Sequence, residues 1–282
     1  MKRRFRLLAD GMPPLDLNSR TAYFRAPSGL GMQRDGTYYD NGGFFVQTDP
    51  KQIQGQIVGD IVIRDDPYRN YQVLANWLTR AKNIRFAYKP TNTEYFADVD
   101  LAYLTKTEIS GGLWLVCPVS FLRCSPWYTM DTQRIDFVNG DGGHKRYTYR
   151  YGYRYRLGYA GGEAEVYLEA QTPGGFAFVA DGPMIGPYLQ LTNADTGEEY
   201  GKVSLPGVSF VAGERLEYSS NPLRPYVRKV GPGGVEDLSN SLDLTARNWF
   251  TIPVYTRCKV TLHSGTAAVS GVVTLYRYWE AV

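Results

Sequence analysis

The sequence has few of the residues on which catalytic and metal sites depend. It contains only 2 histidines and 3 cysteines among 282 residues, and the cysteines (Cys117, Cys124 and Cys258) lack the spacing of metal ligands. There is no P-loop, GxGxxG, HExxH, GxSxG or CxxC motif. The sequence therefore gives no support for a phosphate-binding loop, a zinc hydrolase or a serine hydrolase with a nucleophile elbow. We therefore expect no catalytic residue, no metal site and no cofactor, and we expect the three thiols to be buried and free, as in a protein made in a reducing compartment.

Long apolar runs and a strong excess of one charge are also missing. No stretch of about 18 apolar residues is present, so we expect no insertion into a membrane. The basic start of the chain is not followed by the apolar core of a signal peptide. The formal net charge is only +3, which is too small for a dedicated nucleic-acid binder, because such affinity depends on many phosphate contacts.

Strand and turn formers are abundant instead, with 23 Tyr, 30 Gly and 16 Pro. We expect a single helix with Asp66 as its N-cap, since Pro67 suits the first turn and apolar residues then recur at helical spacing up to Lys82. The preceding segment 52–63 has strand periodicity, with four isoleucines on one parity. Gly55 and Gly59 share that face, where the backbone of another strand could approach closely.

The pattern predicts two mainly-β domains. In the first half, segments 84–88, 95–101 and 113–121 are rich in β-branched and aromatic residues, so we expect a sandwich-like sheet domain carrying the one helix. Short strands at regular intervals in the second half favour an antiparallel β-sandwich. We expect an N-terminal domain over 1–140, a connector over 141–159 and a C-terminal sandwich over 160–282. The strands expected in the sandwich are 165–169, 176–180, 188–192, 202–205, 215–219, 226–230, 257–263 and 272–279.

The connector has an unusual alternation of residue types. In the segment 144–159, HKRYTYRYGYRYRLGY, tyrosines share one parity and arginines the other. A nucleic-acid platform of stacked bases would use this pattern, but so would a strand between domains, which we favour because the rest of the chain has no basic surface. Across the chain, 22 Arg stand against 9 Lys. Arg and Tyr are enriched at protein–protein interfaces, so the composition favours an assembly component over an enzyme.

Other residues leave functional alternatives open. Asp98 and Asp100 lie two apart on an expected strand, as in a glycoside hydrolase pair, but the solvent-exposed face of a half-buried strand explains the same pattern, and we favour that interpretation. Trp249 and outward-facing tyrosines could stack on sugars, which keeps a carbohydrate-binding adhesin as an alternative. His263 ends an alternating strand, where Cys258 faces inward, and we interpret the histidine as a surface residue.

Residues 68–128 carry a resemblance to a known family. The helix is followed by the segment IRFAYKP and then by EYFADVDLAYLTKTEISGGLWLVCPVSFLRCSPWY. This order resembles the N-terminal half of the siphovirus distal tail protein family. The tyrosine-rich connector also resembles that family, and the second half does so more loosely, through residues 196–198 and 248–253. The positions that match the family motifs are Lys106, Glu108, Pro118, Phe121, Pro126, Trp127 and Tyr128.

The resemblance implies a structural role at the tip of a long non-contractile phage tail. It implies a homo-hexameric ring, built by the N-terminal domain around a channel through which DNA passes without specific binding, with a galectin-like C-terminal sandwich outside. The ring would join the tail tube protein and the end of the tape-measure protein to a tail-associated fibre or lysin protein, and in some phages to receptor-binding proteins. The protein would be made in the host cytoplasm and reside in the virion tail tip. The resemblance does not identify the interface residues. We do not extend galectin sugar binding to this chain, because its His-x-Asn-x-Arg and Trp-x-x-Glu strands are missing.

Overall fold

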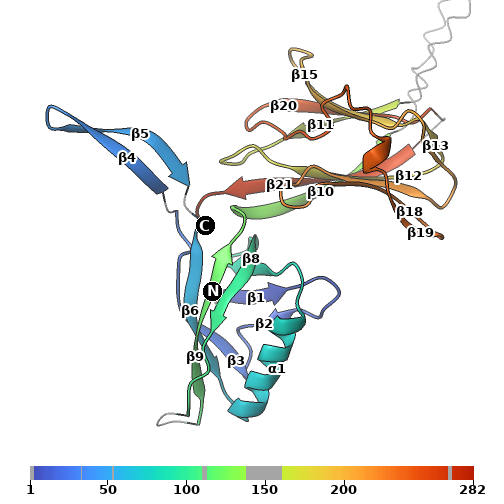
Figure 1. Cartoon of the computed structure of the whole chain (residues 1–282). Coiled ribbons are helices and arrows are strands. Elements are labelled where there is room, and N and C mark those ends of the chain that lie inside the picture. The colour runs from blue at the N-terminus through green and yellow to red at the C-terminus, as the bar shows by residue number, and fades with distance from the viewer. Residues whose placement is uncertain (1–2, 33, 53, 110–112, 138–160, 266–268) are drawn as a thin grey trace, which may run out of the picture. The chain divides into compact units, whose positions relative to one another are not determined.

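The computed structural model describes residues 3–32, 34–52, 54–109, 113–137, 161–265 and 269–282. The chain divides into two compact units, of which unit 1 is Met1–Thr129 with Trp279–Val282, and unit 2 is Met130–Tyr278. Antiparallel strands dominate both units, and the described residues contain one α-helix (Figure 1). The predicted mainly-β fold with a single helix is thus confirmed. The predicted connector 141–159 lies outside the described residues, so the boundaries given to the domains stay a prediction.

Unit 1 is a sandwich-like arrangement in which strand β8 joins two sets of strands. The first half of β8 pairs with β7, and its second half pairs with β9. Beyond β7 lie β1 and β2, and beyond β9 lie β6 and β3. The elements are β1 (Arg4–Leu8), β2 (Leu15–Asp16), β3 (Ala22–Ser28), β4 (Arg34–Asn41), β5 (Phe44–Gln52), β6 (Gln56–Ile63), α1 (Pro67–Arg80), β7 (Arg85–Lys89), β8 (Tyr95–Leu104), β9 (Leu115–Arg123) and β10 (Trp127–Phe137), the last of which continues into unit 2.

Helix α1 begins where the sequence predicts. Pro67 occupies the first turn, and Asp66 precedes it in a left-handed conformation without a side-chain cap, so the aspartate acts here through its backbone and not as a hydrogen-bonding N-cap. The helix buries Leu74, Trp77 and Leu78 against the strands. The indole Nε1 of Trp77 donates to the carbonyl oxygen of Pro13 at 3.0 Å, which pairs the one polar atom of a buried ring.

Strand β6 shows why the sequence needs glycine on its inward face. Ile57, Ile61 and Ile63 are buried on the predicted parity. A Cβ atom at Gly59 would lie only 2.7 Å from the ring of Phe24 on the paired strand β3, and one at Gly55 would lie 3.1 Å from the guanidinium of Arg123. At Gly59 the backbone oxygen of Arg25 would also lie 2.8 Å from a Cβ atom, so the expected close approach of backbone is present there, whereas at Gly55 the close neighbour is a side chain.

Unit 2 is an antiparallel two-sheet sandwich (Figure 1). One sheet has the order β19-β18-β17-β12-β21-β10, and the other has the order β11-β20-β14-β15. The predicted sandwich is confirmed, while its likeness to galectins stays a prediction. The further elements are β11 (Gly161–Tyr167), β12 (Phe176–Asp181), β13 (Met184–Ile185), β14 (Tyr188–Asn193), β15 (Glu199–Ser204), β16 (Ser209–Phe210), β17 (Arg215–Ser219), β18 (Tyr226–Gly231), β19 (Gly234–Asp237), the 3-10 turn η1 (Ser239–Ser241), β20 (Arg257–His263) and β21 (Val269–Trp279).

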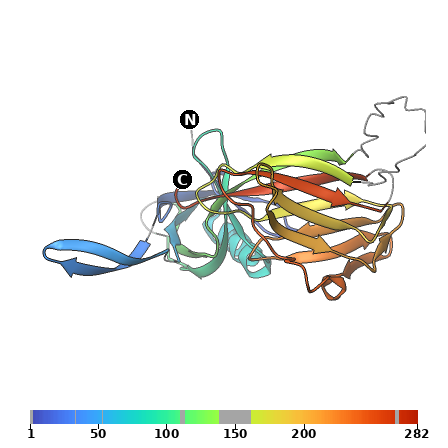
Figure 2. The same ribbon diagram turned by 90° about the horizontal axis from the view of Figure 1, so that it is seen from above.

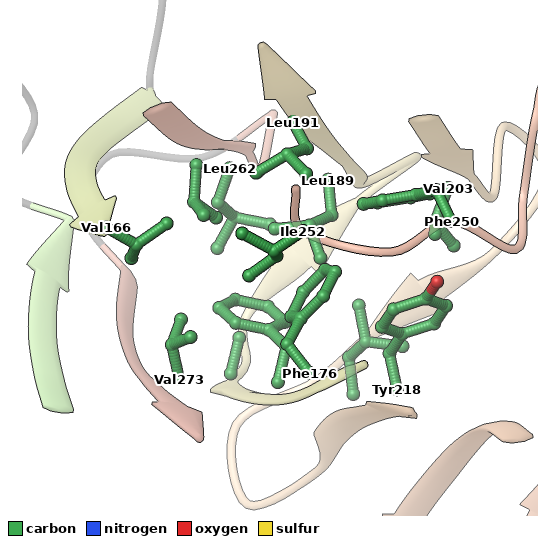
Figure 3. Packing of buried hydrophobic residues seen from close by; sticks show 14 of the residues in the cluster. Val166, Phe176, Leu189, Leu191, Val203, Tyr218, Phe250, Ile252, Leu262 and Val273 are labelled. Carbon is green, nitrogen blue, oxygen red and sulfur yellow. The ribbon is translucent and has the colours of Figure 1, made fainter. Parts of the chain in front are cut away.

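The core of the sandwich is filled by alternate residues of both sheets (Figure 3). Phe176 lies within ring-contact distance of Tyr218 and Phe250, at centroid separations of 5.4 and 5.3 Å. Val260 and Leu262 of β20 are buried with Cys258, as their alternation predicts. The hydroxyl of the buried Tyr218 donates a hydrogen bond to the backbone oxygen of Asn248 at 2.9 Å, so the ring is buried without leaving its polar atom unpaired.

The end of the chain returns to unit 1. Trp279 packs against the core of that unit, and its Nε1 lies 3.5 Å from Thr129 Oγ1. Unit 1 is thus made of two separate stretches of the sequence. Among the described residues, no helix is long and apolar enough to span a membrane.

Candidate assembly surfaces

Strands β4 and β5 form a hairpin that is a two-stranded sheet of its own (Figure 2). Its loop is Gly42-Gly43, between the paired residues Asn41 and Phe44. Both glycines have positive φ, 65° and 91°, as a tight hairpin turn of two residues requires. The carboxylate of Asp40 accepts a hydrogen bond from the backbone N–H of Gly43 at 2.7 Å, which fixes the turn further.

The end of this hairpin exposes four large aromatic side chains, which we call the hairpin tip: Tyr38, Tyr39, Phe44 and Phe45. Their exposed fractions are 59%, 64%, 78% and 72%. Neighbouring residues of a strand point to opposite faces, so each face of the hairpin carries one tyrosine and one phenylalanine. A two-stranded hairpin is marginal in water, and an exposed aromatic patch marks an interaction site. The hairpin tip therefore has the character of an interface that a partner covers on both faces.

Unit 1 exposes a second aromatic surface beside the start of α1, which we call the Trp114 surface. Its side chains are Tyr68 of the helix and Ile109, Leu113 and Trp114 of the segment before β9, with exposed fractions of 44%, 41%, 85% and 43%. The guanidinium carbon of Arg64 lies 5.8 Å from the centroid of the Trp114 ring. Aromatic, aliphatic and cationic groups thus meet on one exposed surface.

A polar network holds Tyr68, one residue of the Trp114 surface, in place. Tyr68 donates its hydroxyl to a carboxylate oxygen of Glu108 at 2.7 Å, and Lys106 lies 3.2 Å from the other oxygen. The Lys106 ammonium is also 5.1 Å from the Tyr68 ring centroid. The hydrogen bond from Tyr68, and then Lys106, lower the pKa of the exposed Glu108 carboxyl. Lys106 and Glu108 are two of the residues that carried the family resemblance, and here they tie the loop after β8 to the helix.

Most of the other resembling residues are buried and serve packing. Phe121 and Trp127 are fully buried, and Tyr128 is nearly so. The rings of Phe121 and Trp127 both contact Phe86, at centroid separations of 5.8 and 6.3 Å. Phe121 and Trp127 are therefore part of the core of unit 1, and together with Tyr128 they contribute almost no accessible surface.

Asp98 and Asp100 do not form the exposed pair that the alternation predicts. Asp100 is exposed, whereas Asp98 is only 6% exposed. The segment after β9 crosses the strand here: the N–H of Asp98 donates to Ser125 Oγ at 2.9 Å, and its carbonyl accepts from Cys124 N–H at 2.8 Å. The expectation of a wet strand face is therefore wrong at Asp98.

The remaining predicted residues are placed as follows. Trp249 is 42% exposed and stacks on the buried Tyr218, at a centroid distance of 5.7 Å. His263 is half-buried and stacks on Tyr188 at 4.0 Å. The Tyr/Arg alternation of 144–159 lies outside the described residues. Within the part of the chain that the structure describes, no three His, Cys, Asp or Glu side chains come together as a possible metal site.

The three thiols are free, but one of them differs from the expectation. Cys117 and Cys258 are buried, whereas Cys124 is half-buried. Burial raises the pKa of Cys258 to about 11. Burial, followed by the hydrogen bond to Asp100, raises the pKa of Cys124 to about 11 as well. All three thiols are therefore protonated at neutral pH, since burial raises the pKa of Cys117 too.

We expect these thiols to react slowly in the folded protein. A thiol-specific disulfide reagent at pH 8 should label less than one thiol per chain over minutes in native protein and three in protein unfolded by guanidinium, because the thiolate is the reactive form. A raised pKa also means that the folded state holds the proton more tightly. The contribution of Cys124 and Cys258 to stability should thus decline as the pH rises from about 9 to about 11. Rapid labelling of Cys124 in folded protein would contradict this assignment.

Comparison with known proteins agrees with the fold of unit 1 and of the whole chain. Residues 5–124 match the family model described as "Distal tail protein, N-terminal domain". A chain in the structure of the phage P2 baseplate in its activated conformation with Ca is similar over 100% of both chains, with 17% identity and a TM-score of 0.73. The crystal structure of the SPP1 Dit protein, described as a paradigm of the hub adsorption apparatus in phages that infect Gram-positive bacteria, is similar over 97% of this chain and 98% of that one, with 10% identity and a TM-score of 0.60. No curated protein sequence matches the chain.

Proposed function

We propose that this chain, whose residues 5–124 match the model of the distal tail protein N-terminal domain, is a structural component of the phage tail and baseplate that assembles into a hexameric ring at the tip of a long non-contractile tail. The ring would join the tail tube protein and the end of the tape-measure protein to a tail-associated fibre or lysin protein, and receptor-binding proteins could attach to it. DNA would pass through its channel. The chain would be made in the host cytoplasm and act in the virion.

The observation that carries this proposal is the hairpin tip. Its four aromatic side chains are more than half exposed, and they lie on a two-stranded hairpin that pairs with no other strand of the described chain. Full burial of a Phe side chain is worth about 1.5–3 kcal/mol. Covering the tip on both faces in an assembly would therefore supply a large part of the association free energy.

Imaging of the purified full chain by negative-stain electron microscopy tests the ring directly. We expect class averages of closed rings with six-fold symmetry and a central opening. Closed rings of another symmetry would overturn the hexamer, and a field of single two-unit particles at micromolar concentration would overturn the ring itself.

A second candidate function rests on Trp249. Its indole ring is 42% exposed and is held parallel to Tyr218, at 14° between the ring planes. A rigid, half-exposed aromatic ring can stack on a sugar, which would make unit 2 a carbohydrate-binding adhesin module. This alternative predicts binding on a glycan array that Trp249→Ala removes, with the far-ultraviolet circular dichroism of the variant unchanged. A blank array with folded wild-type protein would remove the alternative.

A further inference from the structure

A closed ring of identical chains needs two different surfaces on each copy. In a cyclic assembly larger than a dimer, each contact is head-to-tail, so one surface of a copy meets a different surface of the next copy. Unit 1 exposes two aromatic surfaces, the hairpin tip and the Trp114 surface. Each of them groups several exposed apolar side chains, whereas single exposed apolar residues are common on any protein surface. The two surfaces come from separate parts of the sequence.

Each of these surfaces carries one exposed charge without an ion-pair partner. On the hairpin tip, Asp40 uses one carboxylate oxygen for the N–H of Gly43, and no cation among the described residues forms an ion pair with it. On the Trp114 surface, Arg64 lies over the indole ring, and none of the described carboxylates pairs with its guanidinium. The nearby Lys106 differs, because Glu108 already neutralises it.

The backbone around Arg64 is well held. Its N–H donates to the carbonyl of Thr21 at 2.9 Å, and its own carbonyl accepts from the side chain of Asn70 at 2.9 Å. The guanidinium therefore projects from a fixed backbone position and lies over the ring of Trp114. A guanidinium over an aromatic ring keeps its edge available for a carboxylate.

We propose that the hairpin tip of one copy docks on the Trp114 surface of the next copy, with Asp40 pairing with Arg64 across the contact. This inference rests on the proposed ring and specifies its interface. The aromatic side chains of the tip cover Leu113, Trp114 and Tyr68, and the two unpaired charges neutralise each other. The pairing of opposite charges fixes the register of the hairpin on its neighbour, while the apolar contacts supply most of the affinity.

Charge reversal across the interface tests the pairing. Association constants are measured by sedimentation over a dilution series for the full-length wild type, Asp40→Arg, Arg64→Asp and the double variant. We expect each single reversal to weaken association about tenfold or more and the double variant to recover to within about threefold of wild type, as for close interfacial charge pairs. Asp40→Asn keeps the oxygen that accepts the turn hydrogen bond and removes the charge, so it should weaken association without disturbing the hairpin.

Asp40→Arg combined with Arg69→Asp is the matched control, because it has the same formal charges as the double variant. Arg69 is exposed in the first turn of α1, five residues after Arg64, and this combination should show no recovery. The proposal is overturned if wild type forms rings but Arg64→Asp assembles as well as wild type, or if the double variant is weaker than both single variants. A monomeric wild type would instead overturn the proposed ring. Circular dichroism and thermal unfolding of each variant separate these results from misfolding.

Discussion

Replacing Phe44 and Phe45 together with aspartate should convert the assembled protein into monomers. Both rings are more than 70% exposed in the isolated chain, so the replacement removes nothing from the core of unit 1. Burying two Phe side chains in an interface contributes at least about 3 kcal/mol, and buried carboxylates would add a desolvation cost. We expect association at least about a hundredfold weaker than in wild type, as measured by sedimentation.

Leu244→Asp provides the control for this result. Leu244 is 90% exposed in unit 2, so the substitution adds a charge to an exposed apolar site that lies outside the hairpin. It should leave association within about twofold of wild type, because a fully exposed position outside an interface contributes little to binding. If both variants dissociate equally, or if the Phe44 and Phe45 variant remains fully assembled, the hairpin tip is not the interface.

Phe86→Ala should cause the largest loss of stability that we predict for a single substitution in unit 1. Phe86 is fully buried, and its ring contacts those of Phe24, Phe121 and Trp127 at 5.7–6.3 Å. Removal of a buried Phe side chain costs about 3–5 kcal/mol, through lost burial and the cavity that remains. Guanidinium unfolding of the full chain, followed by tryptophan fluorescence, would measure the change in the free energy of unfolding.

Two further variants make that measurement specific. Phe86→Leu refills part of the cavity and should recover a substantial part of the loss, whereas Tyr103→Ala removes a half-exposed ring and should cost less than about 1 kcal/mol. If the midpoint for Phe86→Ala equals that of Tyr103→Ala, Phe86 is not at the centre of the core.

The regular parts of the fold could be predicted from the sequence because their burial is one-sided. Strand β6 alternates buried isoleucines with less buried residues, and α1 repeats its apolar residues at helical spacing behind Asp66-Pro67. Each of these elements packs one face against a core, which is the condition under which periodicity reports structure. The close approach at Gly59 followed from the same strand pattern.

The hairpin tip was missed because it has no buried face. Tyr38-Tyr39 and Phe44-Phe45 place an aromatic ring on both sides of the ribbon, so period-two alternation is absent. The available signal was Asn41-Gly42-Gly43 between aromatic pairs, since two glycines favour a tight hairpin turn. The Trp114 surface was missed for a related reason, because Arg64 and Trp114 lie far apart in the sequence and meet only when the loop before β9 folds against the start of α1.

Asp98 shows the limit of alternation within a strand. The pattern placed Asp98 and Asp100 on one exposed face, but the segment after β9 crosses one of them and leaves the other open. Such a crossing depends on tertiary structure, and the residues around Asp98 in the sequence do not indicate it. The return of Trp279 to unit 1 is similar, because nothing near the end of the chain indicates which core the residue joins.

The central claim is that this chain acts by assembling with copies of itself through exposed surfaces of unit 1. Native mass spectrometry of the purified full chain at micromolar concentration tests it most directly. Each chain has a mass of 31.8 kDa, and the account predicts one dominant species of six copies, about 191 kDa. A spectrum that contains only the 31.8 kDa monomer would contradict it.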